Sequence, residues 1–382
     1  MISKNIHPIL LNCTYAFLII MLSVHILECS TYCTRFSTKT FDLLLMSSRF
    51  FMVFFFLFEE YIHGFDIKRL CYFFVFMSLS VLFVLLNSTW NLFDFFFVPL
   101  FLSNLFSYKT VINIVFYTFV ISVLCVIVLF ALKLIPAANY HRGFILRRSL
   151  GFGHPNALGL MVMMISMVLV LKTQSITFGI KCILLFFSLF CLAIPNSYAS
   201  GLFLLFILVL MHFIEKFEGI LRRNSVKLFC LFLFFMFITI SFVYFIAFTN
   251  SLRELFVNLP GESWARFDMG RDAIYQYGVS IWGNNLTNPD GSSSSPIIDC
   301  TYFNLPVYMG IIPAFIYLGM YILLVRKCIY LKNFRLFLIQ CVVLLYGISE
   351  NIFNYPCFMF LFLINDENLS FLLEESKVCS YS

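Results

Sequence analysis

Residues 111–131 read VINIVFYTFVISVLCVIVLFA, a run of 21 residues without a charged side chain. A helix of about 20 apolar residues crosses the hydrocarbon core of a bilayer. Similar runs recur along the chain, of which 62% is hydrophobic and 12% charged, against about 25% charged residues in a soluble domain. A soluble fold has no room for this excess, so the composition excludes soluble enzymes, disordered proteins and secreted disulfide scaffolds. The sequence predicts an all-α polytopic membrane protein.

Polar residues divide the chain into apolar runs that predict about twelve transmembrane helices. Residues 1–382 are therefore expected to form a single integral membrane domain. The fourth run and the last two are short enough to be re-entrant or tilted elements instead. The predicted spans are 8–27, 41–58, 70–86, 91–107, 111–135, 157–171, 176–194, 200–214, 228–248, 302–325, 336–348 and 351–364.

The distribution of Lys and Arg among the predicted loops indicates the orientation of the chain. With the N-terminus inside, fifteen of these cations fall on the cytoplasmic side and nine on the outer side, which favours two cytoplasmic termini. Six of the nine outer cations are Arg in two segments, the short segment 136–156 and the large loop 249–301. A loop of that length is usually functional. The formal charge of +6 does not indicate nucleic acid, because the cations are spread between apolar runs.

The short outer segment combines cations with glycines, its residues 141–156 reading HRGFILRRSLGFGHPN. Guanidinium groups bind phosphate oxygens bidentately, and a Gly-rich turn offers backbone N–H donors. We therefore expect Arg142, Arg147 and Arg148 to bind a lipid phosphate or diphosphate. The alternative for Arg147 and Arg148 is contact with ordinary lipid headgroups.

Two further residues of this segment are candidates. Asn156 is expected either to bind the substrate or simply to cap the sixth span, which would bring a positive helix end to the same place. His154 titrates near neutrality and is able to relay a proton, whereas a residue that only enters the helix before Pro155 would have no chemical role.

The large loop contains a predicted interfacial helix, because Trp264, Phe267, Ile274 and Ile281 recur at helical spacing. Arg271 falls on the same stripe, where an apolar residue would otherwise be expected.

These loop residues predict a second substrate contact. Arg266 and Arg271 are expected to face a diphosphate, while Trp264, Tyr275 and Tyr277 stack on sugar rings. The alternative is that both Arg form ordinary helical ion pairs with carboxylates three or four residues away.

The run LGFGHPNALG at 150–159, with three Arg before it, resembles a segment of Wzy-type polysaccharide repeat-unit polymerases of the O-antigen polymerase and ligase superfamily. The predicted spans and the large outer loop agree with that family in outline. Many relatives also carry a Ser-Arg pair before a mid-chain span, whereas residues 195–201 read PNSYASG and lack the Arg.

The resemblance implies polymerisation of undecaprenyl-diphosphate-linked oligosaccharide into capsular or O-antigen-type polysaccharide at the outer face of a bacterial plasma membrane. A sugar hydroxyl of the acceptor would displace the lipid diphosphate of the donor. A flippase and a chain-length regulator would be partners in the same pathway. His154, Arg142 and Arg271 are the candidate catalytic residues, and His154 either deprotonates the acceptor or donates a hydrogen bond to the diphosphate.

Glycosyl transfer needs a base for the attacking hydroxyl, and outer carboxylates are candidates for it. No DxD motif, outer His/Cys cluster or nucleotide-binding loop is present in the sequence, so neither a metal nor a cofactor is expected. The candidate carboxylates are Glu254, Glu262, Asp268, Asp272, Asp290, Asp299 and Glu350.

Three other functions remain open. A flippase or transporter of lipid-linked oligosaccharide would use the same cations without chemistry, and it would show internal repeats, which this sequence lacks. A ligase would transfer the finished glycan to another acceptor. A membrane acyltransferase is disfavoured because no acidic residue follows His154 at position 158, which is Leu.

Overall fold

The computed structural model describes residues 2–34, 38–64, 67–87, 90, 93–94, 98, 106–136, 138–142, 144–173, 177–249, 265–284, 298–352 and 355. Helices dominate these residues, and they also contain one two-stranded hairpin. Six of the described helices are long and apolar enough to cross a membrane. The chain is therefore a helical multi-pass membrane protein.

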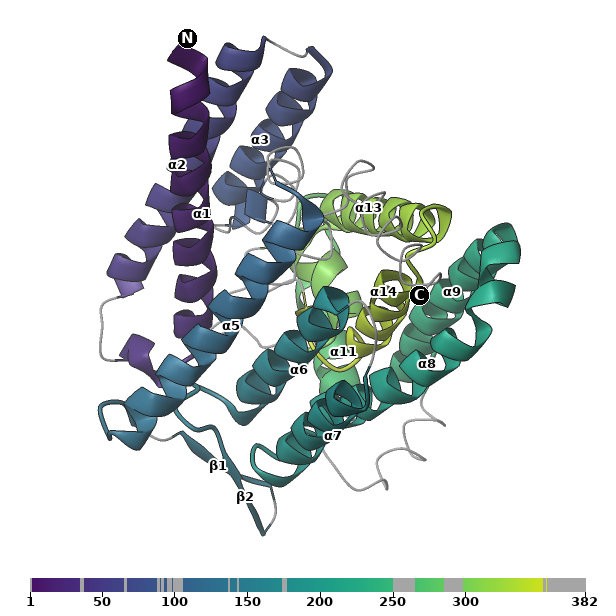
Figure 1. Ribbon diagram of the computed structural model, residues 1–382. Helices are drawn as coiled ribbons and strands as arrows, with labels where there is room; N and C mark the ends of the chain where they lie inside the picture. Colours follow the sequence, from purple (N-terminus) through teal and green to yellow (C-terminus); the bar gives the residue numbers. More distant parts are fainter. Residues whose placement is uncertain are drawn as a thin grey trace. The chain divides into compact units, whose positions relative to one another are not determined.

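The chain divides into two compact units, with boundaries inside helices α3 (Ile67–Asn87) and α8 (Tyr198–Arg223). In the first unit α1 packs against α2 and α5, α5 packs against α6, and α6 packs against α7 (Figure 1). Buried residues occur on every side of α6, as expected for a helix without a polar face. Its helices are α1 (Ile2–Glu28), η1 (Thr31–Thr34), α2 (Thr38–His63), α5 (Tyr108–Ala131), α6 (Pro155–Lys172) and α7 (Phe178–Ala193).

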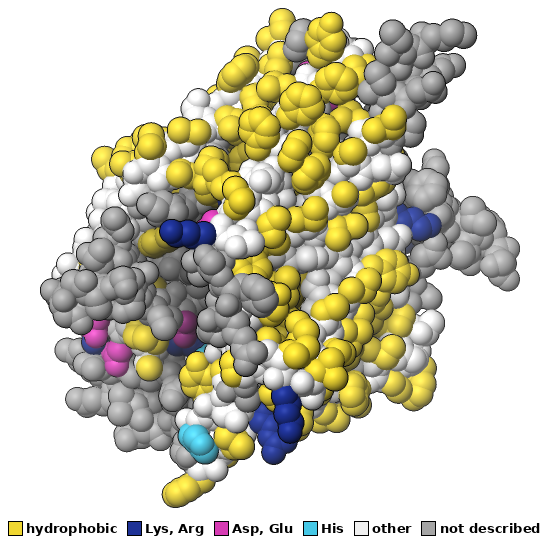
Figure 2. Space-filling view, turned by 90° about the vertical axis from the view of Figure 1, so that its left-hand side faces the viewer, with side chains coloured by type: hydrophobic (Ala, Val, Ile, Leu, Met, Phe, Trp, Pro, Cys, Tyr) yellow, Lys and Arg dark blue, Asp and Glu magenta, His cyan; other side chains and the backbone are white. Residues whose placement is uncertain are grey.

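One stripe of α5 carries large apolar side chains that no part of the described chain covers. Tyr117, Ile121, Leu124 and Val128 lie three or four residues apart, and each is more than half exposed. Hydrophobic side chains also dominate the face of the molecule in Figure 2. Apolar surface of this extent is rare on soluble monomers, so the stripe is the surface that faces lipid.

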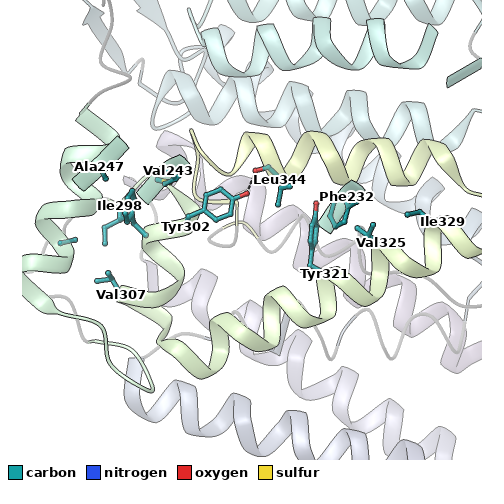
Figure 3. Packing of buried hydrophobic residues seen from close by; sticks show 13 residues of the cluster. Phe232, Val243, Ala247, Ile298, Tyr302, Val307, Tyr321, Val325, Ile329 and Leu344 are labelled. Carbon is teal, nitrogen blue, oxygen red and sulfur yellow. Dashed lines mark hydrogen bonds between the residues drawn. The ribbon is translucent and has the colours of Figure 1, made fainter. Parts of the chain in front are cut away.

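In the second unit α9 packs against α11, α13 and α14. Aliphatic and aromatic side chains pack between these helices (Figure 3), where the Tyr302 hydroxyl donates a hydrogen bond to the Leu344 carbonyl oxygen. The elements of this unit are α9 (Ser225–Phe248), α11 (Ala265–Tyr277), α12 (Thr301–Asn304), the π-helical turn η3 (Leu305–Met309), α13 (Ile311–Tyr330) and α14 (Phe334–Tyr346).

Two glycines make a close backbone approach in the second unit. Gly283 and Gly310 have φ angles of +94° and +96°. A Cβ atom on Gly283 would overlap the carbonyl oxygen of Tyr308, and one on Gly310 would overlap the backbone nitrogen of Gly283. The positive φ of Gly310 also ends the π-helical turn, and α13 begins at Ile311. The prediction of one continuous helix from residue 302 to 325 is therefore wrong.

Ten of the twelve predicted spans coincide with described helices, including the broken one just noted. The other two, 91–107 and 351–364, lie largely outside the described residues. Within the large loop 249–301, the structure describes residues 265–284 and 298–301. The expected helix is present there as α11, which ends at Tyr277, so Ile281 lies beyond it.

Candidate functional site

The Arg- and Gly-rich segment 136–156 contains a β-hairpin, which the prediction of an all-helical fold missed. Strands β1 (Asn139–Arg142) and β2 (Ile145–Arg148) pair antiparallel, with His141 opposite Leu146. Phe144 lies fully exposed between the strands, and the Arg148 side chain is also exposed. Arg142 belongs to β1, but its side chain lies outside the described residues.

Arg147 faces the interior of the first unit, with 5% of its surface exposed. Its Nε donates a hydrogen bond to the Pro195 carbonyl oxygen at 3.1 Å, and its Nη2 donates one to Asn156 Oδ1. The backbone of Arg148 continues the attachment, because its N–H donates to the Ile194 carbonyl oxygen at 3.2 Å. The guanidinium of Arg147 thus fixes the hairpin to α6 and to the turn after α7.

His154 is the N-cap of α6, a role that the sequence had offered to Asn156. Its Nδ1 accepts a hydrogen bond from the Asn156 backbone N–H at 3.1 Å, and Pro155 occupies the first helical position. An imidazole nitrogen that accepts carries no proton, so in the neutral ring Nε2 carries it. The ring also packs edge-on against Tyr140, with 4.7 Å between the ring centroids. His154 is therefore oriented as a hydrogen-bond donor through Nε2.

The turn between β2 and α6 is attached to the end of α1. The Thr31 N–H donates to the Gly151 carbonyl oxygen, and the Gly153 N–H donates to the Cys29 carbonyl oxygen, both at 2.8 Å. Gly151 has a φ of +93°, and a Cβ atom there would lie 2.8 Å from Ile135 Cδ1. Glycine is required at this position, because the turn has neither the backbone angle nor the space for a side chain.

The second unit holds a cluster of one cation and two carboxylates, which we call the Arg266 cluster. Arg266 Nη2 lies 3.0 Å from Glu350 Oε1, and Arg266 Nε lies 3.5 Å from Asp299 Oδ2. The side chain of Glu350 is 8% exposed, whereas that of Asp299 is 30% exposed. Thr301 Oγ1 donates to the Glu350 carbonyl oxygen at 2.8 Å, which fixes the segment after α14 against α12.

The two carboxylates of this cluster come from places that local sequence patterns do not connect. Arg266 and Glu350 are 84 residues apart. A helical ion pair of Arg266 with Glu262 was the alternative expected from spacing, and Glu262 lies outside the described residues. Both carboxylates were among the candidate bases, but no feature of the sequence pairs them with Arg266.

Arg271 is held by carboxylates of its own helix. Its Nη1 lies 3.1 Å from Asp268 Oδ1, and its Nη2 lies 2.8 Å from Asp272 Oδ1. The hydrogen bond to Asp272 is the main reason why the pKa of the Arg271 guanidinium is raised. The Asp268 contact is the ordinary i,i+3 pair that the spacing had offered as the alternative to a substrate contact.

The aromatic candidates of the large loop lie in different surroundings. Tyr275 is 72% exposed, and its ring meets the edge of Phe248 at 5.8 Å between centroids. Tyr277 packs against the hydrophobic core of the second unit instead. Trp264 lies outside the described residues. Among the described aromatic candidates, Tyr275 has the surface that a sugar ring needs for stacking.

The small face of α11 was not recognised from sequence. Gly270 and Ala273 are buried, and a Cβ atom on Gly270 would overlap the ring of Phe303. Small residues three apart on a helix were the available signal. This close packing fixes α11, and with it Arg266 and Arg271, against α12.

Among the described residues no group of three or more His, Cys, Asp or Glu is arranged to hold a metal ion. Comparison with known proteins gives no relative: no protein family, curated protein or solved structure matches the chain. The geometry of the His154 region and of the Arg266 cluster is therefore the basis for assigning a function.

Proposed function

We propose that the protein polymerises undecaprenyl-diphosphate-linked oligosaccharide repeat units at the outer face of a bacterial plasma membrane. The acceptor sugar hydroxyl attacks the anomeric carbon of the donor glycan. A carbon–oxygen bond forms to the acceptor, the bond to the diphosphate oxygen breaks, and the hydroxyl proton passes to a carboxylate. Lipid diphosphate leaves with the electron pair of the broken bond.

The observation that carries this proposal is the Arg266 cluster. Displacement of a diphosphate needs a cation where negative charge develops, and attack by a hydroxyl needs a base. Arg266 supplies the cation, and its 3.5 Å separation from Asp299 puts a base beside it. Asp299 is the stronger candidate for the base, because its side chain is more exposed than that of Glu350. The Glu350 carboxylate is buried and lies 3.0 Å from Arg266 Nη2.

The first unit, considered by itself, offers donors for an anionic ligand. We propose that His154 offers its Nε2–H to a phosphate oxygen bound at this unit, since Nδ1 is already occupied as the acceptor of the cap hydrogen bond. Of the two roles that the sequence left open for His154, donation therefore agrees better with the geometry than proton abstraction. Arg148, whose side chain is exposed, is the better phosphate ligand of the two neighbouring arginines, because Arg147 is buried by its contacts with Pro195 and Asn156. Arg142 and Arg271 remain further candidates.

The first experiment deletes the gene in the native strain and analyses lipid-linked and surface glycans by size. We expect the ladder of long glycans to disappear while single repeat units accumulate on the lipid carrier at the outer leaflet. Accumulation at the inner leaflet would instead indicate a flippase. Full-length glycans that remain on the lipid carrier would indicate a ligase.

The second experiment complements the deletion strain with variants of the Arg266 cluster. Asp299→Asn removes the base at nearly constant volume, and we expect it to lower chain elongation about 100-fold or more. Glu28→Gln is the matched control, because the Glu28 carboxylate also lies within hydrogen-bond distance of a basic side chain, His25, and is 34% exposed. An Asp299→Asn variant that restores the ladder as well as the Glu28→Gln variant would remove Asp299 from the mechanism.

A further inference from the structure

Residues 278–284, which follow α11 and which we call the 278–284 loop, are hydrogen-bonded to the beginning of α13. The Ile311 N–H donates to the Ser280 carbonyl oxygen at 3.0 Å. The Ile312 N–H donates to the Ile281 carbonyl oxygen at 3.1 Å. Helix α13 begins at Ile311 and is long and apolar enough to cross a membrane. The loop therefore lies at the membrane surface where α13 begins.

A second contact joins this region to the end of another membrane-spanning helix. Tyr275, near the end of α11, packs edge-on against Phe248, with 5.8 Å between the ring centroids. Phe248 is the last residue of α9, which is also long and apolar enough to cross a membrane. The end of α9 and the beginning of α13 are thus on the same side of the membrane, and these two attachments fix the depth of the loop between them.

The loop, rather than a face of α11, carries the exposed apolar side chains of this region. Phe267 and Ile274, which the sequence predicted to face the outer leaflet, pack against the hydrophobic core of the second unit. Val279 and Ile281 are 43% and 58% exposed instead. Trp282 lies beside them in the sequence, and Trp is a residue type enriched at membrane interfaces.

These side chains continue the lipid-facing side of α13. Ile311 and Phe315, four residues apart on one face of that helix, are both exposed. Residues 273–284 contain no charged side chain in the sequence, whereas residues 265–272 contain four. The charged part of α11 is therefore followed by an uncharged segment that adjoins lipid.

The backbone of the loop is largely satisfied within the second unit. Asn284 Nδ2 donates to the Gly278 carbonyl oxygen at 3.1 Å, and Ser280 Oγ donates to the Gly283 carbonyl oxygen at 2.6 Å. The Asn284 N–H donates to the Val307 carbonyl oxygen at 3.2 Å. With the two hydrogen bonds to α13, four of the seven loop carbonyl oxygens are occupied. Backbone groups with partners are what insertion next to lipid requires.

We propose that the 278–284 loop is an interfacial anchor, which inserts Val279, Ile281 and Trp282 into the boundary between the headgroups and the acyl chains of the bilayer. Removal of apolar surface from water stabilises this position, and Trp side chains prefer this depth. The anchor does not depend on the reaction proposed for the Arg266 cluster. Because Arg266 lies on α11, the anchor also holds that cluster near the headgroups.

The test measures the depth of Trp282 by fluorescence quenching in the full-length protein, reconstituted in phosphatidylcholine vesicles. Trp90→Phe and Trp264→Phe leave Trp282 as the single tryptophan. Nitroxide groups near the ester or near the end of an acyl chain quench from two depths, and iodide quenches from water. We expect the ester-proximal nitroxide to quench most strongly, at a depth of about 5–10 Å into the boundary, and iodide to quench weakly.

Two variants examine the apolar side chains. Ile281→Asn and Val279→Asn should each lower quenching by the ester-proximal nitroxide about twofold, because the amide has no apolar surface to bury. Val226→Asn is the matched control, since Val226 is an exposed aliphatic residue at the other end of α9. Size-exclusion profiles show whether each variant is folded.

The unaltered chain provides a measurement that needs no substitution. Phosphatidylcholine with a diazirine beside its ester is irradiated with the protein in nanodiscs, and labelled peptides are identified by mass spectrometry. We expect adducts in the 278–284 loop.

Four results would overturn the proposal. No quenching by either lipid, together with no adducts on the loop, would show that lipid does not reach it. Stronger quenching by the nitroxide at the end of the chain would place the loop in the bilayer core. Unchanged quenching in folded Ile281→Asn and Val279→Asn variants would remove these side chains from the anchor. An equal loss of quenching in Val226→Asn would show that the effect is not local to the loop.

Discussion

The contact between Gly283 and the π-helical turn gives a quantitative prediction for Gly283→Ala. The φ angle of Gly283, +94°, lies in the region where the Cβ atom of an L-residue crowds its own backbone. The new methyl group would also overlap the carbonyl oxygen of Tyr308, a backbone atom that no rotamer change moves away. Gly278 provides the control, because its φ is +70° but an added Cβ atom there meets nothing within 4 Å.

The difference between the two variants separates backbone strain from steric overlap. Gly278→Ala introduces only the strain of a left-handed conformation, about 1–2 kcal/mol. Gly283→Ala introduces a similar strain and also overpacks the contact with η3, which adds about 1–3 kcal/mol. We therefore expect Gly283→Ala to lower the free energy of unfolding by about 1–3 kcal/mol more than Gly278→Ala does.

The measurement is equilibrium unfolding of both purified variants in mixed micelles, as the mole fraction of denaturing detergent is raised. Intrinsic tryptophan fluorescence follows the transition, and Trp282 is adjacent to the altered residue. Equal losses of stability in the two variants would refute the reasoning, because they would mean that the backbone beside Gly283 has room for a methyl group.

Three further predictions concern other contacts of the two units. Arg147→Lys cannot keep both side-chain hydrogen bonds and should lower the free energy of unfolding by about 1.5–3 kcal/mol in the same unfolding assay. Arg148→Lys is the control, because it alters an exposed side chain and should change that free energy by less than about 0.5 kcal/mol. Burial raises the pKa of Cys300 to about 12, so its reactive thiolate forms only as the pH approaches that value. At pH 7 a maleimide should therefore modify Cys300 only after the protein is denatured, which peptide mass spectrometry measures. Tyr302→Phe removes the hydrogen bond to the Leu344 carbonyl oxygen and should lower the detergent-unfolding midpoint by the equivalent of about 0.5–1.5 kcal/mol.

Much of the helical architecture follows from hydropathy alone. A segment such as 111–131 has no charged side chain, and α5 covers it as predicted. The hairpin was missed because its strands are only four residues each and together contain three arginines and a histidine. Such a composition is typical of a polar turn. The break at Gly310 was missed because hydropathy does not detect a positive φ angle.

The candidate site was only partly predictable for a related reason. Spacing along one helix offered the pair of Arg271 with Asp268 as the alternative to a substrate contact, and this pair is present. The partners of Arg266 and Arg147 depend on how distant segments pack, and no local pattern contains that information. His154 was identified as a candidate residue, but its orientation follows from the position of the Asn156 N–H in the first turn of α6.

The buried guanidinium of Arg147 has a consequence for biosynthesis. Its two acceptors leave the ribosome at different times, because Asn156 follows it by 9 residues and Pro195 by 48 residues. A nascent chain that has inserted α6 but not α7 lacks the second acceptor. The hairpin therefore obtains its final attachment only after α7 has entered the membrane, so this end of the first unit is completed in the order in which the chain is synthesised.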